Sequence, residues 1–194
     1  YPITFFWILG ITNAINLIDG LDGLSGGLSF ISAITFAFFG YLNNNLPCTY
    51  ISLVLAFAIL GFLVYNLPLP KAKIFMGDGG SQFLGFILSL LPLITPNNTV
   101  TISLVHAIAI LMIPIFDTLA AIWRRLREHR RIDSPDKFHM HHKLLLIGFS
   151  KRKTLFLVLI LQVIVSILCI LSLKLGQYTS LVLLFTVYLI GVFF

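Results

Sequence analysis

Long apolar segments alternate with short polar ones along this chain of 194 residues. A helix that crosses a membrane needs about 20 mostly apolar residues, since each residue adds about 1.5 Å and the hydrocarbon core is about 30 Å thick. Short segments rich in Asn, Pro and Gly separate the apolar ones and mark turns. The pattern predicts seven helices, at about residues 1–16, 24–42, 49–67, 81–95, 99–123, 154–174 and 178–194. The 81–95 segment is short for a span, so we expect it to be tilted or to extend into the preceding loop.

The composition agrees with this pattern. Hydrophobic residues make up 58% of the chain and charged residues only 10%, whereas soluble domains contain roughly 45–50% and about 25%. We therefore expect an all-α fold, a multi-span transmembrane bundle of about seven helices that forms one integral-membrane domain over residues 1–194. Because the chain begins at Tyr1 and ends at Phe194 inside an apolar segment, we expect it to be a fragment of a longer protein.

The basic residues lie mostly on one side of the predicted membrane. Twelve of the thirteen Lys and Arg residues fall in the loops at 68–80 and 124–153, and only Lys174 falls on the opposite side. The positive-inside rule makes the first side cytoplasmic, which predicts a multi-pass cell-membrane protein with its functional loops in the cytoplasm. The net charge of +6 then reflects topology and the lipid bilayer, and no nucleic-acid partner is expected.

All seven acidic residues fall on this same predicted side, at or beyond helix ends, and the orientation rule does not explain their position. The first acidic motif is NAINLIDGLDGLSGG at residues 13–27. If the preceding helix runs to about residue 19, Asn16 and Asp19 share one face of it. Carboxylate and amide oxygens in a glycine-rich turn suit Mg²⁺. The alternative is a polar helix end and turn, with Asp22 as the N-cap of the next helix.

The second motif is KIFMGDGGSQFLGF at residues 73–86, where Asp78 lies among glycines just before the next predicted span. An acid at a helix N-terminus is favoured by the helix dipole, so an ordinary helix end is one interpretation. The other is a second metal-binding acid, beside backbone N–H groups that can face phosphate oxygens. Two acidic, glycine-bordered junctions on one side of the membrane favour the second interpretation.

The third motif begins near the end of a long apolar helix. Asp117 precedes Arg124 and Arg125 by about two helical turns, and an ionisable residue at that depth suggests a functional site. A carboxylate that reaches toward the interface or pairs with an arginine is the alternative, and the arginines are also compatible with a plain topology signal. His106, within an apolar segment, is expected to be packed and hydrogen-bonded rather than catalytic.

Three histidines follow within four residues, at His139, His141 and His142 in the basic loop 124–153. Zinc binding is one interpretation, but no cysteine lies near them. Hydrogen bonding to a polar or anionic ligand fits a basic loop better.

Together and in this order, the three motifs resemble those of the polyprenyl-phosphate N-acetylhexosamine-1-phosphate transferases, which form glycosyltransferase family 4. The resemblance covers about residues 5–150. The H-x-H-H sequence, with F-D-T and R-R before it, is similar to the undecaprenyl-phosphate GlcNAc-1-phosphate branch rather than to the peptidoglycan translocase.

The resemblance implies a Mg²⁺-dependent phosphotransferase, with Mn²⁺ as a substitute, whose metal ligands are Asn16 and Asp78. It implies that Asp19 and Asp22 are the catalytic acidic pair. The residues expected to bind substrate are Asp117, Arg124, Arg125, His139, His141 and His142. The family also carries a paired-aspartate motif in an earlier loop, and this chain has none. We therefore expect this fragment alone to be inactive.

The implied reaction moves N-acetylhexosamine 1-phosphate, most often GlcNAc 1-phosphate, from a UDP-sugar to undecaprenyl phosphate and releases UMP. Such a reaction is the first membrane step in the synthesis of envelope polysaccharides such as lipopolysaccharide. The alternatives are phospho-MurNAc-pentapeptide transfer as in peptidoglycan synthesis, a cation-coupled transporter with acids in broken helices, and a non-catalytic scaffold. The exact sugar and the oligomeric state, including a homo-oligomer, stay open.

Overall fold

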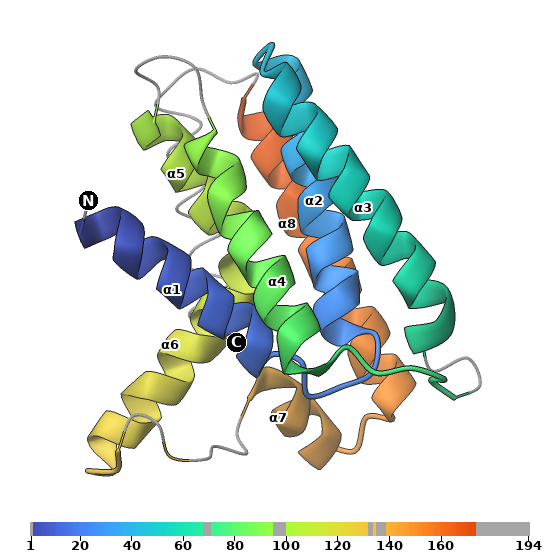
Figure 1. Cartoon of the computed structure of the whole chain (residues 1–194). Helices are drawn as coiled ribbons and strands as arrows, with labels where there is room; N and C mark the ends of the chain where they lie inside the picture. The colour runs from blue at the N-terminus through green and yellow to red at the C-terminus, as the bar shows by residue number, and fades with distance from the viewer. Residues whose placement is uncertain (1, 68–70, 95–99, 132–133, 135–138, 174–194) are drawn as a thin grey trace.

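The computed structural model describes residues 2–67, 71–94, 100–131, 134 and 139–173, and in this part of the chain the protein is all-α (Figure 1). The described elements are α1 (Pro2–Leu17), α2 (Leu24–Leu42), α3 (Leu46–Asn66), α4 (Gly77–Leu90), the 3-10 turn η1 (Leu91–Leu93), α5 (Val100–Ile110), α6 (Met112–Arg127), α7 (Met140–Leu146) and α8 (Lys151–Ser172). The predicted all-α fold is confirmed.

The predicted number of about seven membrane spans is wrong for the described residues. Only α2, α3 and α8 are long and apolar enough to cross a membrane, and α5 with α6 adds a fourth if the two count as one bent span. α1 is apolar but has only 16 residues, and α4 has 14 and begins with a polar Gly-Asp-Gly-Gly-Ser sequence. The predicted helix at 178–194 lies outside the described residues.

The single helix predicted at 99–123 is in fact two helices that meet at an angle of 79°. Pro114 lies in the first turn of α6. A proline has no N–H, and its ring crowds the carbonyl four residues earlier, here that of Ile110. The amide nitrogen of Gln162 on α8 donates to this carbonyl oxygen at 2.7 Å, so the carbonyl that the bend frees is hydrogen-bonded.

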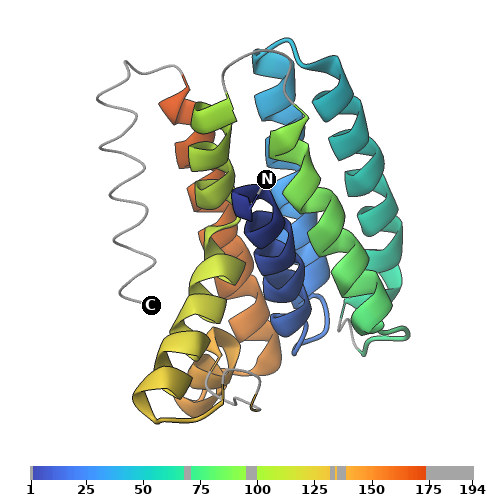
Figure 2. The same ribbon diagram turned by 60° about the vertical axis from the view of Figure 1, so that its left-hand side comes forward.

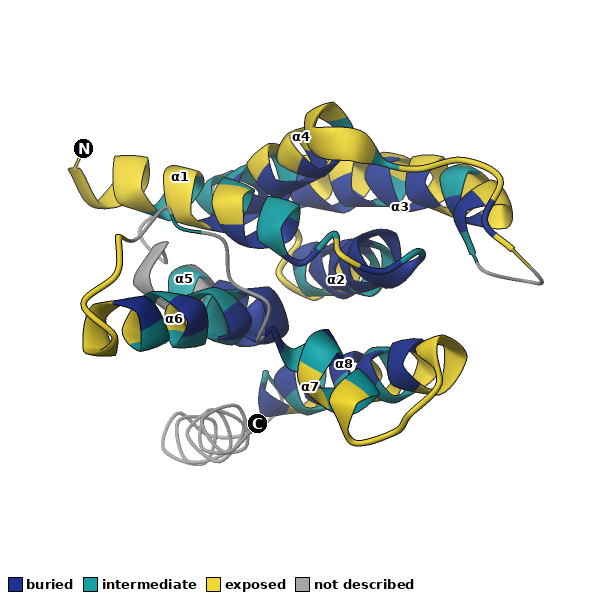
Figure 3. Ribbon diagram, turned by 90° about the horizontal axis from the view of Figure 1, so that it is seen from below, coloured by how far each residue is buried: buried dark blue, intermediate teal, exposed yellow. Residues whose placement is uncertain are grey.

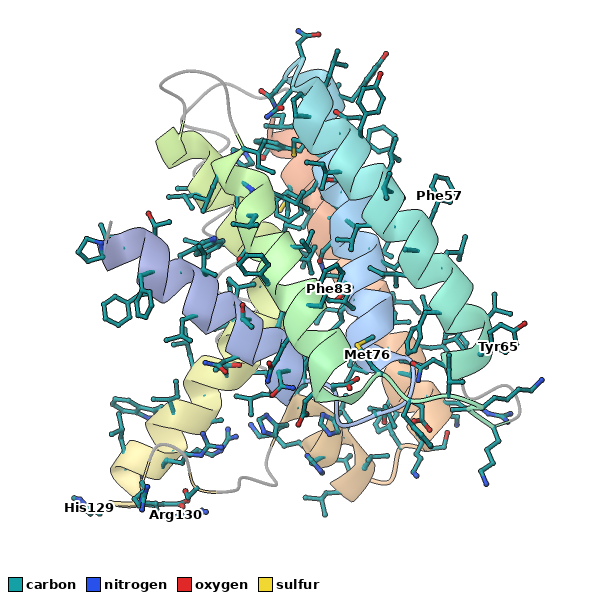
Figure 4. The ribbon with its side chains drawn as sticks, viewed as in Figure 1. Phe57, Tyr65, Met76, Phe83, His129 and Arg130 are labelled. Carbon is teal, nitrogen blue, oxygen red and sulfur yellow. The ribbon has the colours of Figure 1, made fainter. Side chains whose placement is uncertain are left out.

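α2 lies at the centre of the described bundle, with α3, α4 and α8 around it (Figures 1 and 2). Its buried face carries small residues and Phe36, which let its neighbours approach closely. The outer faces of the surrounding helices are exposed (Figure 3). They carry large apolar side chains, including Phe57 on α3 and Phe83 on α4 (Figure 4). Apolar outer faces of this kind suit helices that contact lipid rather than water.

α1 and α4 cross closely, and this crossing positions the candidate site. A Cβ added to Gly85 would lie 2.7 Å from Cα of Thr12, so only glycine allows this backbone approach. One helical turn away along each antiparallel helix, Asn16 of α1 meets Ser81 of α4. At the other end of the crossing, Trp7 Nε1 donates to the carbonyl oxygen of Ser89 at 2.8 Å. We call the whole crossing of α1 and α4 the α1–α4 seam.

Candidate active site

The C-terminal end of α1, the N-terminal end of α4 and the short helix α7 meet at one end of the molecule (Figure 1). The described lysines and arginines also lie at this end, at the C-terminal ends of α3 and α6, on α7 and at the start of α8. The three motifs, far apart in sequence, therefore converge at one end.

The α1–α4 seam brings Asn16 and Asp78 together. The amide nitrogen of Asn16 donates to Asp78 Oδ1 at 3.1 Å and to Ser81 Oγ at 2.8 Å. Since this nitrogen faces α4, the carbonyl oxygen is the atom that Asn16 offers on its other side. Ser81 also donates to backbone carbonyls in the first turn of α4. Sequence reasoning did not single out Ser81, although it stands in the second motif, three residues after Asp78.

Asp19 lies in the loop after α1 and is half-buried. Burial, together with the negative charges of Asp22 and Asp78, raises the pKa of the Asp19 carboxyl from 3.8 to about 6. Asp19 is thus close enough to Asp22 and to Asp78 for their negative charges to act on it. The structure also resolves the alternative for Asp22: the N-cap of α2 is Gly23, in a left-handed conformation with φ of 80° and no side-chain cap. Asp22 is therefore not the N-cap of α2.

The donor set at the seam fits a magnesium ion. In the described chain, no three His, Cys, Asp or Glu side chains gather as a metal cage. Mg²⁺ does not need such a cage, because it usually takes one or two protein ligands and completes its shell with water and phosphate. The Asn16 amide oxygen and the Asp78 carboxylate are oxygen ligands of the kind that Mg²⁺ takes.

The two acidic loops are joined by a residue that sequence reasoning missed. The buried side chain of Asn66 accepts a hydrogen bond from the Gly23 N–H and donates one to the Ile74 carbonyl, both at 2.9 Å. Asn66 lies at the end of α3, outside the three motifs, and no local pattern around it signals this contact.

Asp117 is buried, and both of its oxygens are hydrogen-bonded to residues 139–142, which we call the histidine segment. Oδ2 lies 2.8 Å from His139 Nδ1, and Oδ1 accepts from the backbone N–H of Met140 at 2.7 Å. His139 is the N-cap residue of α7, and Met140 is its first residue. The carboxylate therefore fixes the start of α7 against α6, and the predicted contact of Asp117 and His139 with substrate stays a prediction.

His141 packs against the first motif. It is 2% exposed, and a Cβ added to Gly20 would lie 2.6 Å from its Nε2. Within the described residues neither ring nitrogen of His141 has a hydrogen-bond partner. The His142 ring lies beside it, with centroids 4.1 Å apart. Burial and the neighbouring His142 and His139 lower the pKa of His141 from 6.5 to about 4, against the opposing effect of Asp117.

The remaining predicted residues fall further along α6. Arg124 and Arg125 lie in its last turn, Arg124 partly buried and Arg125 buried. Their predicted contact with substrate stays a prediction. The tip beyond α6, with His129 and Arg130, points away from the bundle (Figure 4). His106 is buried, with Nε2 3.1 Å from Ser172 Oγ, so its packed, hydrogen-bonded environment is confirmed.

Comparison with known proteins identifies the family. Residues 1–96 match the family described as "Glycosyl transferase family 4". The chain belongs to this family. It is 45% identical, over 86% of its length, to the "Probable undecaprenyl-phosphate N-acetylglucosaminyl 1-phosphate transferase" of Bacillus subtilis (strain 168), of which it covers 46%.

Two further relatives have related names. One is the "Decaprenyl-phosphate N-acetylglucosaminephosphotransferase" of Mycobacterium tuberculosis (strain ATCC 25618 / H37Rv), 35% identical over 77% of this chain and 42% of the relative. The other is the "Undecaprenyl-phosphate alpha-N-acetylglucosaminyl 1-phosphate transferase" of Escherichia coli (strain K12), 32% identical over 81% and 44%. The chain spans about half the length of the curated relatives it matches.

Proposed function

We propose that the protein transfers GlcNAc 1-phosphate from UDP-GlcNAc to undecaprenyl phosphate, the first lipid-linked step in the synthesis of an envelope polysaccharide. An oxygen of the acceptor phosphate attacks the phosphorus that carries the sugar. The new P–O bond forms as the bond to the UMP oxygen breaks, and UMP leaves with the electron pair. The names of the relatives in glycosyl transferase family 4 support this activity.

The observation that carries the proposal is the convergence of the motifs. Asn16 of the first motif is hydrogen-bonded to Asp78 of the second, and Gly20 of the first is in contact with His141 of the third. A reaction between a water-soluble donor and a lipid acceptor needs its polar groups at the end of the helices, where both substrates can reach them. The elements that carry the motifs, the end of α1, the start of α4 and α7, meet at one end of the helices (Figure 1).

Asp19 is the residue best suited to proton transfer. A carboxyl whose pKa is raised to about 6 is close in acidity to the second ionisation of a phosphate monoester, which lies near 6. We assign Asp19 the role of accepting a proton from the acceptor phosphate, since a base works best when its pKa is near the operating pH. Asp22 holds that pKa up by its negative charge.

The substrates are both anionic and repel each other, so the site needs positive charge. Asn16 and Asp78 would hold Mg²⁺, which when bound would neutralise the donor diphosphate. The basic residues at the same end, among them Arg124 and Arg125, would attract both phosphates. The neutral imidazole of His141 would hydrogen-bond the donor rather than repel or attract it by charge. This end of the bundle would face the cytoplasm, where UDP-sugars are available.

Two of the other interpretations are less well supported than GlcNAc 1-phosphate transfer. The α5–α6 break resembles a broken transporter helix, but the carbonyl that Pro114 leaves free already accepts a hydrogen bond from Gln162, and the three interacting acids lie at helix ends. Transfer of phospho-MurNAc-pentapeptide uses similar chemistry, yet the relatives described above are named for N-acetylglucosamine.

The proposed function is tested by radiolabel transfer. The full-length gene product, purified in detergent, is given UDP-[¹⁴C]GlcNAc and undecaprenyl phosphate with Mg²⁺ or with EDTA. We expect labelled lipid only with Mg²⁺, and at least a 100-fold lower rate for Asp78→Asn. Gly79→Ala is the matched control, because a Cβ there meets no atom within 4 Å. Absence of labelled lipid, or preference for UDP-MurNAc-pentapeptide, would overturn the assignment. Full activity of Asp78→Asn would overturn the metal site.

A further inference from the structure

Asn66 is a buried polar residue whose two hydrogen bonds both go to loops of the candidate site. It is 4% exposed, at the C-terminal end of α3. Its Oδ1 accepts from the Gly23 N–H, and its Nδ2 donates to the Ile74 carbonyl oxygen. An asparagine amide is one of the few side chains that can accept and donate in this way at once.

The two partners of Asn66 belong to the two acidic junctions. Gly23 directly follows Asp22, and its φ of 80° turns the chain from the first acidic loop into α2. Ile74 lies four residues before Asp78, in the segment that leads into α4. One side chain therefore spans the two segments whose carboxylates interact with one another.

We propose that Asn66 is a positioning residue for the transferase, which sets the spacing between the Asp19–Asp22 loop and the segment that leads to Asp78 at the start of α4. The role rests on the proposed function, because that function requires both loops to face the same pair of phosphates. Asn66 itself does not touch substrate. It acts through the backbone of two residues that lie near the acids. Gly23 directly follows Asp22, and Ile74 lies four residues before Asp78.

The chemistry of the contact explains why asparagine is needed. Aspartate has nearly the same shape and still accepts from the Gly23 N–H. It has no N–H for the Ile74 carbonyl, however, and sets a negative oxygen against it in a buried site. Asn66→Asp therefore breaks one of the two bonds and pushes the two loops apart, while Asn66→Leu removes both bonds and keeps the volume.

The same helix offers a matched control at its other end. Asn45 is 5% exposed. Its Oδ1 accepts from the Cys48 N–H at 3.2 Å and its Nδ2 donates to the Ile94 carbonyl. Asn45 thus has the same burial and the same bonding pattern, but it is separated from the acidic loops by the whole length of α3. Asn45→Asp keeps the cap of α3 and loses the donor to a backbone carbonyl, that of Ile94, as Asn66→Asp loses the donor to that of Ile74.

The test compares Asn66→Asp, Asn66→Leu and Asn45→Asp in the full-length gene product. Steady-state transfer from UDP-GlcNAc gives kcat and KM, and hydrogen–deuterium exchange measures protection of peptides covering 18–24 and 71–77. We expect both Asn66 variants to lower kcat at least 10-fold with less than 3-fold change in KM, and to lose protection in both peptides. Asn45→Asp is expected to stay within 3-fold of the unsubstituted protein and to keep protection there.

Each other outcome counts against the positioning role. An equal loss of kcat in the Asn45 and Asn66 variants would make Asn66 merely structural. A change in KM alone would make it a substrate-binding residue. Unchanged exchange in 18–24 and 71–77 would show that the bridge does not hold the loops. If the unsubstituted protein transferred no GlcNAc 1-phosphate, the proposed function would fail, and the exchange measurement would still decide whether Asn66 joins the loops.

Discussion

The two sides of the candidate site are held in place by different forces. On one side, Asn16 meets Asp78 and Ser81 because α1 and α4 pack backbone against backbone at Gly85. On the other side, the carboxylate of Asp117 on α6 accepts hydrogen bonds from the start of α7, at His139 and Met140. The geometry of the first side depends on the small volume of Gly85, which lets two helix backbones touch. The geometry of the second side depends on the charge and the hydrogen bonds of Asp117.

This difference indicates which substitutions each side tolerates. Packed helix backbones have no room for an added carbon, and the cost of overpacking spreads along both helices. A buried carboxylate that accepts two hydrogen bonds tolerates no loss of either acceptor, but its removal leaves the helices themselves in place. A larger residue in the α1–α4 seam is therefore expected to disrupt the acidic side of the site. Loss of the Asp117 charge is expected to disrupt the histidine side.

The largest effect is expected for Gly85→Leu. Even one added Cβ would lie 2.7 Å from Thr12 Cα, so a leucine must force α1 and α4 apart at a cost of about 3 kcal/mol. Thermal unfolding in detergent measures the loss, and transfer activity should fall with it because Asn16 leaves Asp78. Gly10→Ala on α1 is the control, since its Cβ meets no atom within 4 Å. Equal melting temperatures for the two variants would show that the seam is not close-packed.

The next largest effect is expected for Asp117→Asn. The substitution removes the charge that assists two buried hydrogen bonds, which costs about 2 kcal/mol. The loss is local, so α7 should loosen while the bundle stays folded. Limited trypsin cleavage after the exposed Lys143 on α7 measures this loosening, and KM for UDP-GlcNAc should rise. The control is Glu128→Gln, which removes an exposed carboxylate paired with exposed Arg130. Unchanged cleavage in Asp117→Asn would contradict the anchoring role.

The sequence predicted one side of the site better than the other. Asn16, Asp19 and Asp78 stand in glycine-bordered motifs, and their meeting follows from two helix ends that were predicted on the same side of a membrane. The anchoring role of Asp117 was not predictable, because it depends on the 79° bend that places α6. The local signal for that bend is Pro114, which stands inside a continuous apolar segment and does not by itself fix the bend angle. A long-range contact such as that of Asn66 leaves no local pattern.

A smaller effect is expected for Gly20→Ala, where the two sides touch. The added Cβ would lie 2.6 Å from His141 Nε2, but the imidazole ring can shift, so we expect a cost of about 1 kcal/mol. The displaced His141 should raise KM for UDP-GlcNAc more than it lowers kcat. Gly79→Ala, in the other acidic junction, has space for its Cβ and is expected to change neither. Equal KM values for the two variants would show that His141 does not take part in binding UDP-GlcNAc.

The smallest net effect is expected for pH in the unsubstituted protein, because two titrations of opposite sign nearly cancel. The pKa of Asp19 is raised from 3.8 to about 6, so the folded protein binds the extra proton between these values. Its contribution to stability is present below pH 3.8 and is lost as the pH rises through about 6. The pKa of His141 is lowered from 6.5 to about 4, so here the unfolded chain binds the extra proton. That contribution is present above pH 6.5 and is lost as the pH falls toward 4.

In the unsubstituted protein the two slopes oppose each other over nearly the same range, so stability should vary little between pH 4 and 6.5. Asp19→Asn removes one slope, and its melting temperature should fall as the pH is lowered from 6.5 to 4. His141→Asn removes the other, and its melting temperature should fall as the pH is raised from 4 to 6. The quantity to compare is the change of melting temperature with pH. Absolute melting temperatures are not compared, because each substitution also changes packing. Parallel slopes in the two variants would show that the acidic and histidine sides do not titrate as opposites.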